Sequence, residues 1–278
     1  MDLSAEVVAQ LNAHVAAWRA SEPVFDRTGL TRFAVLGHDL GWLQPDTASF
    51  LTGFDPAFLL TPERLRLNIS DVTTAEVLLQ QAAQKLYDDG RMPGWRNELY
   101  DLHAPAADGT PDLTQSLLKL ERAAFRTFGF TSLAVHINGY RDDGQMWIAR
   151  RALTKQVDPD LLDNLAAGGI ASGEHTAACA MRELWEEAGV PADMAQHVVP
   201  VGQLHPLRNV ADGVHDEILY CYDLRLPEDF VPHNADGEVA SFECLSLPDV
   251  AARLGQMTWD AAAVTAAFIQ RRLATASI

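Results

Sequence analysis

The feature that most constrains this chain is the stretch between residues 168 and 190, with the sequence GGIASGEHTAACAMRELWEEAGV. Its segment HTAACAMRELWEEA contains neither glycine nor proline and stops at Gly189, so we expect it to form a helix. Glu183, Glu186 and Glu187 are three and four residues apart and therefore project from one face of that helix. From the spacing alone, the ordinary alternative is a solvated acidic face.

Three carboxylates this close repel one another and raise one another's pKa, an arrangement that a helix rarely builds for stability. A bound divalent cation would make it favourable. Oxygen ligands select Mg²⁺, with Mn²⁺ as a substitute, rather than zinc. Gly168, Glu174 and Arg182 stand in register with the glutamates, and this favours a metal site over a solvated face.

The residues around the glutamates have roles consistent with this interpretation. The guanidinium of Arg182 would orient Glu183 and keep it ionised, although it could also be an ordinary surface arginine. Gly168 and Gly169 could form a simple turn. On the functional interpretation, their loop offers a backbone carbonyl to the metal and lets a phosphate approach closely.

The stretch matches every fixed position of the pattern G-x5-E-x7-R-E-U-x-E-E-x-G-U, where U is aliphatic, and the chain therefore resembles the Nudix hydrolases. A chance match has a probability on the order of one in ten million. The resemblance implies a C-terminal α/β/α sandwich with a mixed sheet and Mg²⁺-dependent hydrolysis of a diphosphate joined to a group X. The implied metal ligands are Glu183, Glu186, Glu187 and Gly168. The implied catalytic residues are Arg182, Glu183 and Glu238. Gly169, Glu174 and Gly189 would support the loop and the helix.

The general base is left open by the resemblance. It could be Glu183 or a glutamate outside the stretch, for which we favour Glu238 over Glu217. Glu174 is expected to lie a helix length away from the acidic cluster and to act through the loop.

Flanking segments narrow the resemblance to a branch related to thiamine pyrophosphokinase, which carries an N-terminal domain named DUF4743. The matching segments are WRNELYDL (95–102), FGFTSLAVHINGY (128–140), WIARRALTK (147–155), DPDLLDNLAAGGIASGE (158–174) and LPEDFVPHNADGEVASFECLSL (226–247). The resemblance implies thiamine diphosphate, or its oxidised or antagonist analogues, as the substrate and the monophosphate with phosphate as products.

Cations near the stretch are candidates for holding the terminal phosphate. Arg150, Arg151 and Lys155 follow a predicted strand, and strand-end surface charge is about equally consistent with them. Asn164 could contact the substrate, with a structural role in the loop slightly favoured.

Three other functions remain open. A nucleoside-diphosphate hydrolase acting on ADP-ribose or a dinucleotide would share the same stretch. An isomerase of isopentenyl diphosphate would need a catalytic cysteine, for which Cys179 inside the helix is poorly placed. A sensor that binds a phosphorylated ligand without catalysis would not need all the carboxylates.

The rest of the chain predicts two domains. We expect a small α+β domain over residues 1–115, a linker at 104–112, a helix over 113–130 and the Nudix domain over 128–275. Ser4 could cap a first helix, and Leu65 and Leu67 alternate with polar residues as in a strand.

Composition excludes several classes of protein. The chain has 38 Asp and Glu against 21 Lys and Arg, a formal charge of −17, which disfavours binding to nucleic acid. Three cysteines without paired spacing argue against a disulfide scaffold and structural zinc. Asp2 and Glu6 fit no signal peptide, and no apolar stretch is long enough for a membrane span. We therefore expect a cytoplasmic protein whose partner is a small-molecule diphosphate, with a homodimer left open.

Overall fold

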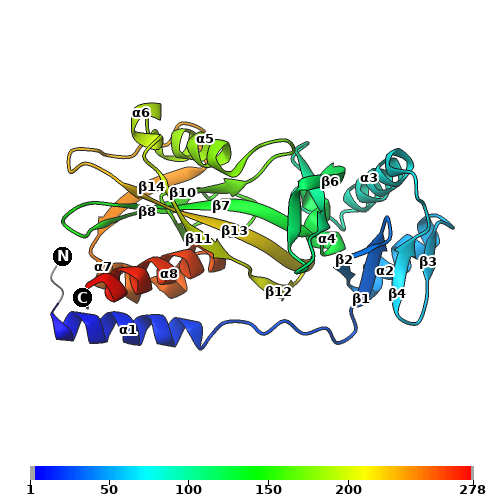
Figure 1. Cartoon of the computed structure of the whole chain (residues 1–278), viewed down its shortest axis with the longest axis horizontal. Helices are drawn as coiled ribbons and strands as arrows, with labels where there is room; N and C mark the ends of the chain where they lie inside the picture. The colour runs from blue at the N-terminus through cyan, green and yellow to red at the C-terminus, as the bar shows by residue number, and fades with distance from the viewer. Residues whose placement is uncertain (1–3, 277–278) are drawn as a thin grey trace.

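The computed structural model describes residues 4–276, so Asp2 lies outside the described residues. The chain forms a large sandwich of helices and one sheet, and a smaller unit built around a second sheet (Figure 1).

The large sheet is mixed, as predicted. Its main path runs β11 (Val199–Leu204), β13 (Gly213–Arg225), β7 (Thr131–Tyr140), β8 (Met146–Arg151) and β14 (Val239–Leu245). The central pair β13 and β7 is parallel, and the other pairs are antiparallel. Three short strands add to the sheet: β9 (Leu162–Asp163) on β8, β10 (Ala166–Gly169) on β7 and β12 (Leu207–Val210) on β13.

Helices cover both faces of this sheet, which confirms the α/β/α sandwich (Figure 1). One face carries α5 (Thr176–Ala188) and the short α6 (Ala192–Ala195), over a core of aliphatic residues from β7 and β13. The other face carries α7 (Leu247–Ala252), the 3-10 turn Leu254–Gln256 and α8 (Trp259–Ala276).

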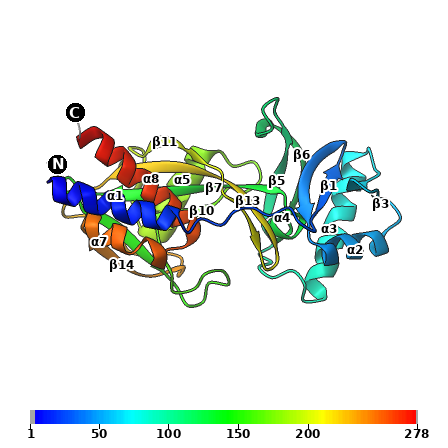
Figure 2. The same ribbon diagram turned by 90° about the horizontal axis from the view of Figure 1, so that it is seen from below.

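The first helix, α1 (Ala5–Arg19), also lies on the second face of the large sandwich. The side chain of Ser4 caps it, as predicted. Leu11, Val15 and Trp18 are buried against α7 and α8. The chain then runs in an extended path to the smaller unit (Figure 2). The predicted domain bounds of 1–115 and 128–275 stay a prediction.

The smaller unit is α+β, as predicted. Its sheet has the order β2 (His38–Leu43), β1 (Thr31–Val35), β4 (Arg64–Leu67) and β3 (Phe58–Leu60). Helices α2 (Pro45–Phe54) and α3 (Val72–Asp88) complete it. Its core contains a cluster of aromatic rings, of which Phe33 stacks on Phe130 at 5.5 Å between ring centroids.

The structure corrects two predictions in the middle of the chain. The expected linker at 104–112 is the end of a hairpin of β5 (Leu99–Pro105) and β6 (Pro111–Glu121), and only α4 (Arg122–Phe128) is helical in the region 113–130. Tyr100, Leu102 and Ala104 alternate with more exposed residues, so the hairpin packs as a strand pair. The leucines of β6 have a spacing that fits a helix as well as a strand. Pairing with β5 makes the segment a strand.

Within the described part of the chain, no helix combines the length and the apolar character that a membrane crossing requires.

Candidate active site

Helix α5 is the predicted helix and carries the acidic cluster. It spans Thr176–Ala188 and ends at Gly189, whose φ of 62° is left-handed and suits a residue without a side chain. Glu183 and Glu187 are buried at 7% exposure each, whereas the side chain of Glu186 is 42% exposed. Two carboxylates of the cluster therefore face the sheet together with the apolar side of the helix.

Gly168 lets β10 approach the cluster closely. A Cβ added to Gly168 would lie 1.8 Å from Oε1 of Glu183, so no other residue fits without moving that carboxylate. One residue earlier on β10, the backbone N–H of Ala167 donates to Oε2 of Glu187 at 2.9 Å. Both buried glutamates therefore contact adjacent residues of β10, Glu183 at Gly168 and Glu187 at Ala167.

The N-terminal hairpin braces the loop that follows β10. A Cβ on Gly169 would lie 1.5 Å from the Tyr100 hydroxyl, so Tyr100 of β5 fills the space above this glycine. Asp101 accepts hydrogen bonds from the Gly173 N–H at 2.8 Å and from the Ser172 hydroxyl at 3.1 Å. The sequence did not predict these contacts between β5 and the loop. The one feature that pointed to them was the segment WRNELYDL, which belongs to the resemblance.

Arg182 links the parts of the cluster. Its Nε and Nη2 donate to the two oxygens of Glu174, each at 2.9 Å. Its Nη1 donates to Glu183 at 2.6 Å and to Glu186 at 3.0 Å. Glu174 therefore lies against the cluster through one shared guanidinium, and the expectation that it acts from a helix length away is wrong.

Burial dominates the electrostatics of the two inner glutamates. Loss of hydration raises the pKa of Glu183 to about 7, even though Arg182 opposes the rise. The pKa of Glu187 is also raised, first by burial and then by the charge of Glu183. Both carboxylates thus ionise fully at neutral pH only when more positive charge is nearby. Their oxygen atoms, beside the open backbone of Gly168, fit a hard divalent cation.

Lys155 and Glu238 lie next to this cluster. The ammonium of Lys155 is 3.7 Å from Oε1 of Glu187 and forms a close ion pair with Glu238. Burial lowers the pKa of Lys155. Arg96, from the N-terminal domain, reaches Glu238 at 3.5 Å.

The other predicted phosphate contacts divide into two groups. Arg151 lines the cavity beside the cluster and donates to Asp163 at 2.8 Å. Arg150 lies outside the cavity lining and donates to the backbone oxygen of Asp160 at 2.8 Å. Asn164 is 1% exposed, also lies outside the lining, and is bonded to His136, Asn138 and Thr265.

A cavity of about 760 Å³ opens in front of the cluster, between the two domains. The Nudix stretch contributes Gly168, Arg182 and Glu183 to its wall. The N-terminal domain contributes residues from β5 and α4, among them Tyr100 and Arg122. Sequence reasoning could not assemble this wall, because its members are distant in the chain.

Comparison with known proteins agrees with this fold. Residues 131–268 match the NUDIX domain family, and residues 9–132 match a domain of unknown function, DUF4743. The chain therefore carries a DUF4743 domain followed by a NUDIX domain.

The plant protein "Nudix hydrolase 20, chloroplastic" of Arabidopsis thaliana is 40% identical over 173 residues, which cover 60% of this chain and 44% of the relative. "Nudix hydrolase 24, chloroplastic" of the same plant is 39% identical over 173 residues, covering 60% and 45%. The chain thus spans about half the length of these relatives. Among solved structures, DR0079 from Deinococcus radiodurans is similar with a TM-score of 0.47 and 23% identity, over 60% of this chain and 97% of that one.

Proposed function

We propose that this protein is a divalent-cation-dependent pyrophosphohydrolase, with Mg²⁺ as the cation and thiamine diphosphate, or its oxidised or antagonist analogues, as the substrate. The products are the monophosphate and phosphate. One observation carries the proposal: two buried carboxylates contact neighbouring residues of β10 beside a large cavity, Glu183 at Gly168 on the cavity wall and Glu187 at the backbone N–H of Ala167.

Glu183, Glu186, Glu187 and the backbone of Gly168 would hold the cation. When bound, it neutralises charge on the diphosphate and lowers the pKa of the attacking water. The protein's own groups supply the remaining steps. Arg182 fixes the Glu183 carboxylate through its 2.6 Å hydrogen bond and so sets the position of a ligand oxygen.

Proton transfer and phosphate binding fall to side chains next to the cluster. Water forms a new bond to phosphorus, the bridging P–O bond breaks, and the water proton passes to Glu238, which lines the cavity. Lys155, Arg151 and Arg96 are the cations at that part of the wall, and we assign them to the phosphate groups.

Thiamine diphosphate is supported by the segments that flank the Nudix stretch and by the position of the DUF4743 domain, which forms one wall of the cavity. An isomerase that depends on a cysteine is disfavoured. Cys179 is fully buried in α5, and burial raises the pKa of its thiol far above the neutral range.

The test is a hydrolysis assay with Mg²⁺ and equal concentrations of thiamine diphosphate, oxythiamine diphosphate, ADP-ribose and NADH, followed by release of phosphate or nucleotide. We expect the thiamine compounds to have the highest kcat/KM. Preferred cleavage of ADP-ribose would contradict the substrate assignment, and no cleavage of any compound would favour the sensor. The Glu187→Gln variant serves as the inactive control.

We also propose a cytoplasmic location, supported by the three free cysteines.

A further inference from the structure

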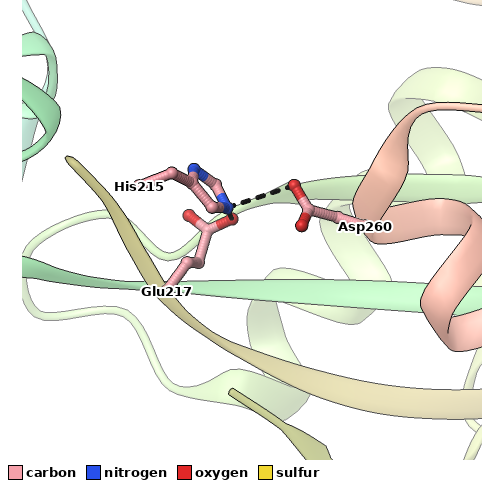
Figure 3. Close-up of side chains that lie close together, drawn as sticks. All are labelled: His215, Glu217 and Asp260. Carbon is pink, nitrogen blue, oxygen red and sulfur yellow. Dashed lines mark ion pairs between the residues drawn. The ribbon is translucent and has the colours of Figure 1, made fainter. Parts of the chain in front are cut away.

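A second group of side chains with metal-binding chemistry lies on the cavity wall, away from the Nudix stretch. His215 and Glu217 are two residues apart on β13 and share one face of the strand, while Asp260 comes from the first turn of α8. Figure 3 shows the three side chains directed toward one another. His215 is 6% exposed, and the side chains of Glu217 and Asp260 are each 16% exposed. All three residues line the cavity.

Strand register gives the distance between this group and the Nudix cluster. Glu217 lies opposite Ser132 of β7, and Gly168 lies opposite Val135 on the other side of β7. Three residues along β7 and two strand spacings across it place the Cα atoms of Glu217 and Gly168 ~14 Å apart. The group therefore marks the far end of the cavity, and an ion bound there would be separate from one bound by the Nudix glutamates.

The distances between the three side chains are close to those of ligands around one ion. Nitrogen and oxygen ligands lie about 2.1 Å from a divalent ion such as zinc, so two of them are roughly 3.0 Å apart at a right angle and about 3.4 Å apart at the tetrahedral angle. Nε2 of His215 lies 3.2 Å from Oδ2 of Asp260 and 3.7 Å from Oε2 of Glu217. The three ligand atoms all lie within 4.8 Å of one another. A small rotation of the Glu217 side chain would complete the spacing.

The hydrogen bonding of His215 independently indicates an ion. The ring is buried, and among the described residues Nε2 has no hydrogen-bond partner. Glu217 is too distant to accept from it, and the oxygen of Asp260, although 3.2 Å away, is out of line. Buried polar atoms without a partner are uncommon in folded proteins, and a bound ion is one of their ordinary explanations. Coordination at Nε2 would satisfy this atom and both carboxylates together.

The contact between Arg208 and Asp260 is compatible with an ion. Arg208 donates to both oxygens of Asp260, at 2.9 and 3.2 Å. Each carboxylate oxygen has two lone pairs, so Oδ2 can accept from Arg208 and bind an ion at the same time. The Nudix cluster has the same kind of contact, since Arg182 donates to Glu183.

The remaining charges near His215 also allow a cation. Nη2 of Arg126 is 3.4 Å from Nδ1, longer than most hydrogen bonds, and its Nη1 is 4.0 Å from Asp212. An ion at Nε2 leaves the ring proton on Nδ1, so we expect the guanidinium to turn toward Asp212. Within residues 4–276, no lysine or arginine forms an ion pair with Glu217. The net charge of −17 further favours the approach of cations.

We propose that His215, Glu217 and Asp260 form a second metal site at the far end of the cavity, for a first-row transition ion such as Zn²⁺. One imidazole and two carboxylates are a mixed set of nitrogen and oxygen ligands, which favours such an ion over Mg²⁺. The ion joins β13 to the first turn of α8. Three protein ligands leave a further coordination position, which faces the cavity because all three residues line it. The inference goes beyond the proposed function and does not depend on it.

Binding of Zn²⁺ to the full chain, measured by calorimetry without substrate, tests the inference. The measurement uses the Glu183→Gln, Glu187→Gln double variant, so that the Nudix cluster does not compete for the ion. We expect one Zn²⁺ ion per chain. Adding His215→Ala or Glu217→Gln should weaken its binding by at least about 100-fold, because each change removes a ligand and even residues that only orient ligands contribute roughly 10- to 100-fold.

His197→Ala is the matched control, because His197 is exposed and lies outside the cavity lining. Its addition to the double variant should leave the affinity for Zn²⁺ unchanged. Glu217→Gln guards against loss of the fold, since glutamine keeps the shape of the side chain and can still accept from the Ser132 hydroxyl. Zn²⁺ should raise the melting temperature of the double variant and should have little effect once Glu217→Gln is added.

A double variant that binds no Zn²⁺ would overturn the inference. Equal affinity for Zn²⁺ after His215→Ala or Glu217→Gln would also overturn it. The three residues would then form only an ion-pair network between β13 and α8. In that case His215→Ala should lower the melting temperature by the same amount with and without Zn²⁺.

Discussion

Glu183→Gln should stabilise the metal-free protein at pH 8 while it slows turnover. Burial raises the pKa of Glu183 to about 7, from an ordinary value of 4.5. The difference corresponds to ~3 kcal/mol. Because the folded protein holds this proton more tightly than the unfolded chain does, the stabilisation is complete below the unfolded pKa and is lost as the pH rises through about 7. Glutamine keeps the shape of the side chain and has no charge to bury.

Thermal unfolding in the presence of a chelator at pH 8 and pH 5 measures this effect. At pH 8 the variant should melt roughly 6 °C or more above wild type. Most of the difference should disappear at pH 5, where wild-type Glu183 is largely protonated. Adding Mg²⁺ should raise the melting temperature of wild type more than that of the variant. Turnover should fall by about 10²-fold, or ~3 kcal/mol of transition-state stabilisation.

Glu228→Gln is the control for this series, since an exposed carboxylate should change neither melting temperature nor turnover. The reasoning would be refuted if Glu183→Gln melted at or below the wild-type temperature at pH 8 without metal. Normal turnover with normal binding would instead show that the carboxylate has no part in the chemistry.

Three further outcomes are expected. Chelation should abolish hydrolysis, Mg²⁺ or Mn²⁺ should restore it and zinc should not, which activity assays after dialysis can check. Glu174→Gln should lower kcat by about tenfold, less than Glu183→Gln does, because Arg182 keeps its bonds to Glu183 and Glu186. A chain that starts near residue 125 should fold poorly or lose affinity, because it removes Tyr100 from above Gly169; a soluble fragment with unchanged kinetics would contradict this.

The sequence predicted the acidic cluster of the helix because its members are close together in the chain. A helix fixes the relative positions of residues three and four apart, so Glu183, Glu186 and Glu187 could be placed on one face without a structure. The resemblance implied a role for the backbone of Gly168 at the metal, which stays a prediction; in the structure Gly168 lies against Glu183. The sequence could not predict that Arg182 would fold back onto Glu174, because a side-chain rotamer decides that contact.

The hairpin of β5 and β6 could not be predicted for a different reason. The leucines of β6 match both a helix and a strand, and only the pairing of Leu102 with Leu118 on the facing strand distinguishes them. Residues 95–103 do fit a strand, but without its partner strand nothing in the sequence placed Tyr100 and Asp101 against the loop after β10. Arg150 and Asn164 were predicted to contact the substrate because they are polar and close to the motif. Both instead form hydrogen bonds within the protein and lie outside the cavity lining.

The two ends of the cavity depend on different kinds of sequence information in this chain. The end of the cavity that carries the acidic cluster is built from one helix and one short strand, both within residues 166–188. The far end depends on the parallel register of β13 with β7, which brings Glu217 opposite Ser132 across 85 residues of chain. A shift of two residues in that register would leave the Nudix stretch intact and move Glu217 by ~7 Å along the cavity. We therefore expect chains that share the stretch to differ mainly at this far end of the cavity.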